Sequence, residues 1–229
     1  MTASAPTRSM TASVIGSAIM LVGFVLVVLA ALRWQANGWE AMVWLLCFVL
    51  QLVIRVPHTR RARGIAIADR RKDASEQLVL GFMFLAMMFL PLLHLSSGAF
   101  AFADYRLPVW AGIVGAVVQL PFLWLFWRSH ADLGINWSPG LELREGHGLV
   151  TSGVYARIRH PMYAALFLSA LAQPLLVQNW LAGVLAIPAA AALWFVRVPL
   201  EEKMMRDTFG SEYQTYCART GRLLPKFTA

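Results

Sequence analysis

The sequence predicts an all-α protein that crosses a membrane about six times. Hydrophobic residues make up 59% of the 229 residues and charged residues only 14%, whereas a soluble domain carries about 25% charged residues. The charges are concentrated between apolar stretches, and a bilayer core about 30 Å thick needs about 20 apolar residues in a helix. A membrane, rather than water, is therefore the expected environment of most of the chain.

Six apolar segments are candidates for these spans. They are residues 13–32, 39–54, 78–97, 107–127, 161–178 and 180–198. The first is longer than the apolar core of a signal peptide, which has about 7–15 residues, and Arg33 follows it instead of a cleavage site. We therefore expect it to be retained as a span. The second is short, but Trp39 and Trp44 can anchor it at the membrane interface. The last two meet at Gln178-Asn179, which predicts a tight helical hairpin.

The basic residues predict how these spans are oriented. With six spans, the loop after the second span, the loop after the fourth and the C-terminal tail all lie on one side, together with Arg8. Only Arg33 and Arg106 lie on the other side. The positive-inside rule then places both termini in the cytoplasm. Basic residues beside spans also contact anionic membrane lipids, so the net charge of +8 does not predict nucleic acid as a partner.

We expect one membrane domain over residues 1–229, built in two parts. Residues 1–127 contain the N-terminal spans, and residues 128–229 form a C-terminal, cofactor-binding half that contains the hairpin. Polar chemistry is expected in this second half, because the loop before the hairpin and the tail after it would both face the cytoplasm. A rough apolar stripe over residues 199–219 predicts a helix, which can lie on the membrane surface as an amphipathic helix and can also close a site.

Neither the cysteines nor the histidines are spaced as metal ligands. Cys47 lies in an apolar segment and Cys217 lies in the polar tail, so we expect no disulfide between them. The five histidines show no pairing typical of zinc enzymes. The sequence therefore predicts neither a structural nor a catalytic metal.

The segment Gly146–Tyr163 is a polar, glycine-rich entry to the hairpin. Its glycines allow the backbone to approach a ligand closely. Pro161 suits the first turn of a helix, which places His160 at the N-cap and Tyr163 one turn further on. A helix N-terminus presents free N–H groups and a positive dipole end, which would suit the carboxylate of a bound amino acid. The glycine spacing matches neither a dinucleotide nor a P-loop fingerprint.

A second polar cluster follows the last apolar segment. Arg197 lies at the membrane boundary, where long basic side chains commonly extend to the headgroups. Glu201 lies one turn further on if the helix continues through Pro199, and its carboxylate could accept hydrogen bonds from ribose hydroxyls or pair with an ammonium group. Glu202 is expected on a solvated face.

Two blocks in the C-terminal hundred residues resemble the isoprenylcysteine carboxyl methyltransferase family. The first contains Leu149–Tyr155 and Arg159–Tyr163, and the second contains Arg197, Glu201-Glu202, Phe209–Tyr213 and Tyr216. The resemblance implies a helical membrane fold that binds S-adenosylmethionine at its cytoplasmic face. By position, the implied cofactor contacts are His147, Gly148, Leu149, Val150, Tyr155, His160, Pro161, Met162, Tyr163 and Glu201.

The resemblance further implies that Arg197 is the catalytic residue and faces the substrate. The chain departs from the family pattern in one place, because residues 136–142 contain no glutamine, whereas the family has a glutamine contact just upstream of the His147 position. Methyl transfer from a sulfonium is an in-line displacement that needs alignment and a dry site, and it needs no metal. A membrane enzyme suits a lipophilic or lipidated acceptor, because the cofactor arrives from water and the acceptor from the bilayer.

The favoured acceptor is a carboxylate, such as that of an isoprenylated cysteine, or a thiolate. A guanidinium such as that of Arg197 pairs well with a carboxylate, whereas a phospholipid amine would gain nothing from a cation. Three alternatives remain: a phospholipid amine N-methyltransferase, a membrane sterol-type reductase that uses a nicotinamide cofactor, and a non-enzymatic membrane protein. S-adenosylmethionine crosslinking, tested against reduced nicotinamide, separates the first two.

Overall fold

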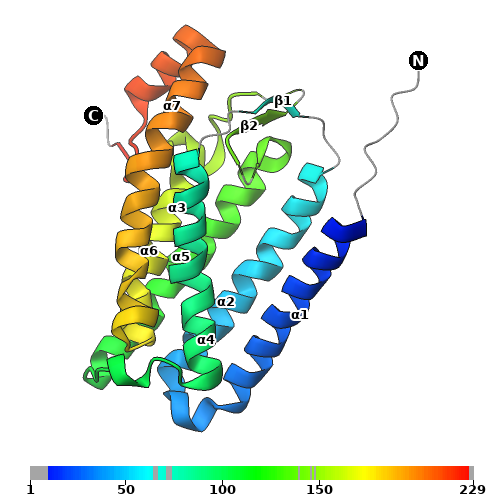
Figure 1. Ribbon diagram of the computed structural model, residues 1–229. Coiled ribbons are helices and arrows are strands. Elements are labelled where there is room, and N and C mark those ends of the chain that lie inside the picture. The colour runs from blue at the N-terminus through cyan, green and yellow to red at the C-terminus, as the bar shows by residue number, and fades with distance from the viewer. Residues whose placement is uncertain are drawn as a thin grey trace.

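The computed structural model describes residues 10–63, 67–70, 74–138, 140–144, 146 and 148–226. Within these residues, six helical segments run alternately in opposite directions (Figure 1). They are α1 (Met10–Leu32), α2 (Trp34–Arg63), the continuous run α3 (Ala74–Phe84), η1 (Leu85–Phe89) and α4 (Leu90–Ser97), α5 (Val109–Leu133), α6 (Pro161–Leu176), and the run η5 (Trp180–Val184) and α7 (Ala186–Arg219). Each corresponds to one predicted apolar segment, so the all-α class is confirmed.

Four of these segments are both long and apolar enough to cross a membrane, as judged over the described part of the chain. They are Trp34–Arg61, Ala74–Ser97, Val109–Asn136 and Trp180–Arg219. Ala18–Leu32 and Pro161–Leu176 are shorter apolar helices. The chain is an integral membrane protein, and six crossings remain a prediction.

The outer face of α5 shows why the bundle needs lipid around it. Trp110, Ile113, Val117, Leu120 and Trp124 follow one another at helical spacing, and their exposed fractions are between 52% and 67%. Side chains on the opposite face, such as Phe122 and Phe126, are buried against α6. A large apolar stripe that water would otherwise contact is typical of a membrane surface.

Short elements connect the helices at both ends of the bundle. β1 (Ile67–Arg70) pairs antiparallel with β2 (Glu142–Arg144), and Ile67 lies opposite Arg144. The 3₁₀ turns η3 (Gly134–Asn136) and η4 (Gly153–Ala156) lie in the connection between α5 and α6, and η2 (Ala101–Ala103) lies between α4 and α5. β1, β2 and the last turns of α7 all lie at the upper end of the bundle in Figure 1.

The last helix covers the predicted residues 199–219 and packs against the protein. α7 continues from the apolar hairpin through Pro199 and breaks only at Gly210, whose φ is 51°. Met204, Tyr213 and Tyr216 from the predicted surface stripe are instead buried inside the protein. The stripe therefore packs on the loops of the protein, which provide an apolar surface closer than the membrane does.

The orientation of the bundle can be tested with single cysteines. In a chain with Cys47 and Cys217 replaced by serine, Arg61→Cys and Ala99→Cys place thiols at opposite ends of the bundle. We expect a membrane-impermeant maleimide to label Arg61→Cys from the cytoplasmic side and Ala99→Cys from the other side, because the positive-inside rule places the basic loops in the cytoplasm. Labelling of both thiols from the same side would mean that the run from α3 to α4 does not cross the membrane, which would reject the six-span topology.

Candidate functional site

A cavity opens at the end of the bundle where the loops before α6 meet the end of α7. Its walls come from α2, α3, the connection between α5 and α6, α6 itself and α7. Ten of the residues predicted from the sequence line it together. They are Gly148, Leu149, Val150, Tyr155, His160, Pro161, Met162, Tyr163, Arg197 and Glu201. The remaining predicted contact, His147, lies outside the described residues.

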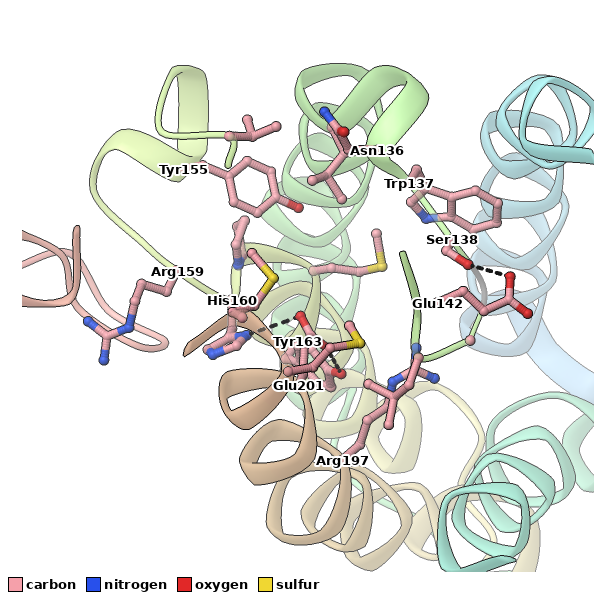
Figure 2. Close-up of a pocket in the computed structure, with 18 of the residues that line it drawn as sticks. Asn136, Trp137, Ser138, Glu142, Tyr155, Arg159, His160, Tyr163, Arg197 and Glu201 are labelled. Atoms are coloured by element: carbon pink, nitrogen blue, oxygen red, sulfur yellow. Dashed lines mark hydrogen bonds and ion pairs between the residues drawn. The ribbon is translucent and has the colours of Figure 1, made fainter. Parts of the chain in front are cut away.

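The centre of the cavity holds three side chains from α6 and α7. Pro161 begins α6 with His160 at the N-cap, as the sequence predicts, so Tyr163 lies one turn inside the helix. The Tyr163 hydroxyl donates to Glu201 Oε2 at 2.6 Å, and His160 Nδ1 lies 3.7 Å from Glu201 Oε1. Figure 2 shows these three side chains pointing toward one another. The Glu201 side chain is nevertheless 30% exposed, so its carboxylate can still accept hydrogen bonds from a ligand.

Glu202 was expected on a solvated face, but the structure places it inside the protein. Its exposed fraction is only 3%. His160 Nε2 lies 3.2 Å from its Oε1, and Arg222 donates two hydrogen bonds, from Nε at 3.1 Å and from Nη2 at 2.8 Å. Arg159 and Arg206 lie within 3.7 Å and 3.5 Å of the same carboxylate. Four basic side chains therefore surround this single buried acid, which explains why it does not face solvent.

His160 lies against both glutamates. Burial alone would lower the pKa of His160, but its hydrogen bonds and charge interactions with Glu201 and Glu202 outweigh that effect and raise the pKa above its ordinary value. The imidazolium form is therefore favoured. His160 pairs with Glu202 through Nε2, and its Nδ1 faces Glu201 at 3.7 Å, so His160 is suited to hold the two glutamates in place.

The C-terminal tail ties this cluster to the loop before α6. Ile158 and Gly221 form a parallel β-bridge, and the backbone N–H of His160 donates to the Arg222 carbonyl at 3.0 Å. The Arg159 guanidinium donates to the Cys217 carbonyl at 3.1 Å and to the Thr220 carbonyl, at the end of α7. A cation is favourable there because the last carbonyls of a helix carry negative partial charge.

Gly153 has a structural function within the glycine-rich loop. Its φ is 61°, and a Cβ at this position would lie 2.1 Å from Asp132 Oδ2. That same oxygen accepts a hydrogen bond from the Val154 N–H at 2.8 Å. Gly153 therefore allows the loop to dock on α5. Gly148 has open space around its Cα instead, and its N–H donates to Asn136 Oδ1 at 3.0 Å.

Arg197 lies deeper in the cavity than Glu201, and its side chain is only 10% exposed. Its Nη1 is 3.4 Å from Glu76 Oε1, and Glu76 also accepts a hydrogen bond from the Leu141 N–H at 3.1 Å. The pair connects α3, α7 and the loop before β2. The Arg197 guanidinium also interacts with Tyr163 and Glu201.

The opposite wall contains residues that the sequence reasoning missed. Trp137 is buried beside the cavity, and the Arg55 guanidinium carbon lies 5.5 Å from the centre of its ring. Ser138 donates to Glu142 at 3.1 Å across from Glu201 (Figure 2). Glu76 and Arg222 were also missed. The available signal in the sequence was an acidic or polar residue beside apolar or basic segments. Such a residue needs a partner if it is buried.

No group of three or more histidine, cysteine or acidic side chains suited to a metal ion occurs within the described ranges. The described lining of the cavity presents carboxylates, guanidinium groups and aromatic rings.

Several known proteins are similar in sequence to this chain. Residues 113–207 match the isoprenylcysteine carboxyl methyltransferase (ICMT) family. A probable protein-S-isoprenylcysteine O-methyltransferase of Oryza sativa subsp. indica is 26% identical over 189 residues, which is 81% of this chain and 97% of that protein. Protein-S-isoprenylcysteine O-methyltransferase A of Arabidopsis thaliana is 30% identical over 117 residues, 49% of this chain and 55% of that protein. The Saccharomyces cerevisiae protein-S-isoprenylcysteine O-methyltransferase is 35% identical over 79 residues, 34% of this chain and 33% of that protein.

Proposed function

We propose that this chain, which belongs to the isoprenylcysteine carboxyl methyltransferase family and is a methyltransferase, transfers a methyl group from S-adenosylmethionine to a lipophilic carboxylate at the cytoplasmic membrane face. The observation that carries this proposal is the position of Glu201. It is the one member of the adjacent glutamate pair that keeps its carboxylate open to the cavity, while Glu202 is fully engaged by basic side chains.

The side chains present fit S-adenosylmethionine, which supplies an activated methyl group on a sulfonium sulfur. Glu201 offers acceptors for ribose hydroxyls or for an ammonium group. Trp137 and Tyr155 supply aromatic surface for a flat base, and the loop 148–150 brings backbone groups to the cavity wall. Residues Met162 and Tyr163 complete the wall at the start of α6.

The electrostatics of α6 alter one detail of the expected binding mode. The sequence suggested that the N-terminus of α6 would hold the carboxylate of the cofactor. Glu201 and Glu202 already lie against His160 at this end of the helix, and a third carboxylate would be repelled by them. We therefore assign the ammonium group or the ribose hydroxyls of the cofactor to this corner.

Arg197 supports a carboxylate as the acceptor. It lies one helical turn before Glu201, on the side of the cavity nearer the apolar part of α7. A guanidinium there can pair with an incoming carboxylate and hold it ionised, which the displacement requires. The relatives are named for methylation of S-isoprenylcysteine, whose carboxylate and apolar stem fit this arrangement.

Calorimetric binding of S-adenosylmethionine to the protein in detergent tests the cofactor site. Glu201→Gln keeps the size of the side chain but removes its charge, so we expect the affinity to fall about tenfold or more, as for the loss of a charge-assisted hydrogen bond. Tyr163→Phe, which removes the hydroxyl that orients Glu201, should cause a smaller loss. Glu212→Gln, at an exposed position of the same helix, is the matched control. If Glu201→Gln binds S-adenosylmethionine with the affinity of the parent protein, the cofactor does not bind at Glu201.

A further inference from the structure

Arg55 is a cation in the cavity wall that forms no ion pair within the described part of the chain. It lies on α2, inside the apolar segment Trp34–Arg61, and its side chain is partly buried. Its guanidinium contacts the ring of Trp137, and Arg197, which lines the same cavity, repels it. An ionised side chain inside a membrane-spanning helix normally has a partner. Arg55 is therefore a candidate binding site for an anionic group of a ligand.

Trp137 places a second unpaired donor beside Arg55. Its side chain is only 2% exposed, and its Nε1–H is buried without an acceptor among the described residues. The ring also packs against His130 of α5, with 5.1 Å between the ring centres. Buried donors in proteins nearly always have an acceptor. A carboxylate accepts hydrogen bonds and pairs with a guanidinium, so it would satisfy both of these neighbouring groups.

The charges of the cavity indicate which carboxylate this is. S-adenosylmethionine carries one carboxylate, and the proposed acceptor carries another. Of the three arginines in the described lining, Arg159 is bound to Glu202 and the tail, and Arg197 suits the acceptor. The cofactor carboxylate is excluded from the N-terminus of α6, because Glu201 and Glu202 would repel it there. Arg55 is the lining guanidinium that remains for it.

We propose that Arg55, together with the Nε1–H of Trp137, binds the carboxylate at the amino-acid end of S-adenosylmethionine. This inference rests on the proposed function and adds a binding residue on α2 to those on α6 and α7. Because the carboxylate lies on the wall opposite Glu201, the ribose hydroxyls are the groups left for Glu201 to bind. With one contact on each wall, the sulfonium between them is held in a fixed position, which aligns its methyl group for transfer.

Decarboxylated S-adenosylmethionine is a matched probe, because it keeps the base, ribose, sulfonium and amino group and lacks only the carboxylate. Binding of both compounds to the full-length protein in nanodiscs is measured by calorimetry. We expect the parent protein to bind S-adenosylmethionine about tenfold more tightly, as for one charge-assisted contact. Differences in hydration between the two compounds are the same for every variant, so they cancel when ratios of affinity are compared.

Arg55→Met should bring this ratio close to one, because methionine has an unbranched apolar stem but no donor. The affinity for S-adenosylmethionine should fall. The affinity for the decarboxylated compound should stay the same or rise, because its sulfonium and amino group are no longer repelled by a guanidinium. Trp137→Phe keeps an aromatic ring and removes the N–H, so it should lower the ratio about two- to threefold.

Arg60→Met is the matched control, because Arg60 is exposed on the same helix and lies outside the described lining of the cavity. It should keep the parental ratio. Glu201→Gln should weaken both compounds alike, since both carry the ribose. An N-acetylated S-prenylcysteine and its methyl ester separate the two possible sources of the carboxylate. Arg55→Met should keep the parental preference between this acid and its ester.

Three results with the sulfonium compounds would overturn the inference. They are equal affinities in the parent protein, an unchanged ratio in Arg55→Met, and a loss of affinity for both compounds in that variant. A changed preference between the prenylcysteine acid and its ester would also overturn it, because the carboxylate at Arg55 would then be that of the acceptor. An unchanged ratio in Trp137→Phe would remove the indole N–H from the site.

If Arg55→Met does not fold, Arg55→Gln provides the same comparison. The inference and the proposed function can fail separately. Failure of the parent protein to bind S-adenosylmethionine would refute the proposed function and, with it, this inference. Binding of S-adenosylmethionine with a ratio that does not depend on Arg55 would refute only the inference.

Discussion

Replacing Glu202 with glutamine is expected to destabilise the protein by about 3 kcal/mol, as for the loss of one partner from a buried ion pair. Glu202 lies against four basic side chains, which are His160, Arg159, Arg206 and Arg222. Without its charge, the imidazolium and the buried part of Arg159 would repel each other. Arg206 and Arg222 are half-exposed, so water screens part of this repulsion and keeps the loss moderate.

Thermal unfolding in detergent, followed by tryptophan fluorescence, measures this effect. Glu212→Gln removes an exposed carboxylate from the same helix and should change the midpoint little. Arg222→Gln removes one of the repelling cations, so the double variant Glu202→Gln, Arg222→Gln should be less destabilised than the sum of the two single changes. Strictly additive losses would show that the two side chains do not interact, contrary to the bidentate contact.

The same cluster shows why part of the site could not be predicted from the sequence. Pro161 and His160 could be placed because the start of a helix is a local property of the chain. Glu201 could be placed because it lies one turn after Arg197 in a helix that continues through Pro199. The burial of Glu202 depends instead on Arg222, which arrives through a β-bridge between the tail and the loop before α6. Pairings between distant segments leave no local pattern in a single sequence.

The fold was predicted more completely than the site for a related reason. Each helical segment corresponds to an apolar run in the sequence, and the thickness of the bilayer sets the length of that run. The six segments can therefore be located from the sequence alone. β1 and β2 were not predicted, because the first is only four residues long and the second three. Glu76 lies in the first turn of α3, where an acid is ordinary at a helix start. Only the packing of α3 beside α7 brings it to Arg197.

Arg197→Lys is expected to reduce turnover about ten- to hundredfold, in line with the cost of misplacing a reacting group, while the affinity for S-adenosylmethionine remains nearly unchanged. Lysine keeps the charge but loses the planar fork that binds a carboxylate through two parallel hydrogen bonds. It would also have fewer donors to divide between Glu76 and the acceptor. Methylation of an N-acetylated S-prenylcysteine, followed by mass spectrometry, gives turnover, and calorimetry gives cofactor affinity.

The control is Arg219→Lys, an exposed position near the end of α7, which should methylate as the parent protein does. Two results would contradict the assignment of Arg197 to the acceptor. Loss of cofactor binding in Arg197→Ala would place the residue in the cofactor site. If both Arg197 variants turn over as fast as the parent protein, Arg197 does not bind the acceptor and only forms its ion pair with Glu76. If only turnover falls, the acceptor carboxylate meets a guanidinium that the ion pair with Glu76 on α3 helps to hold in place.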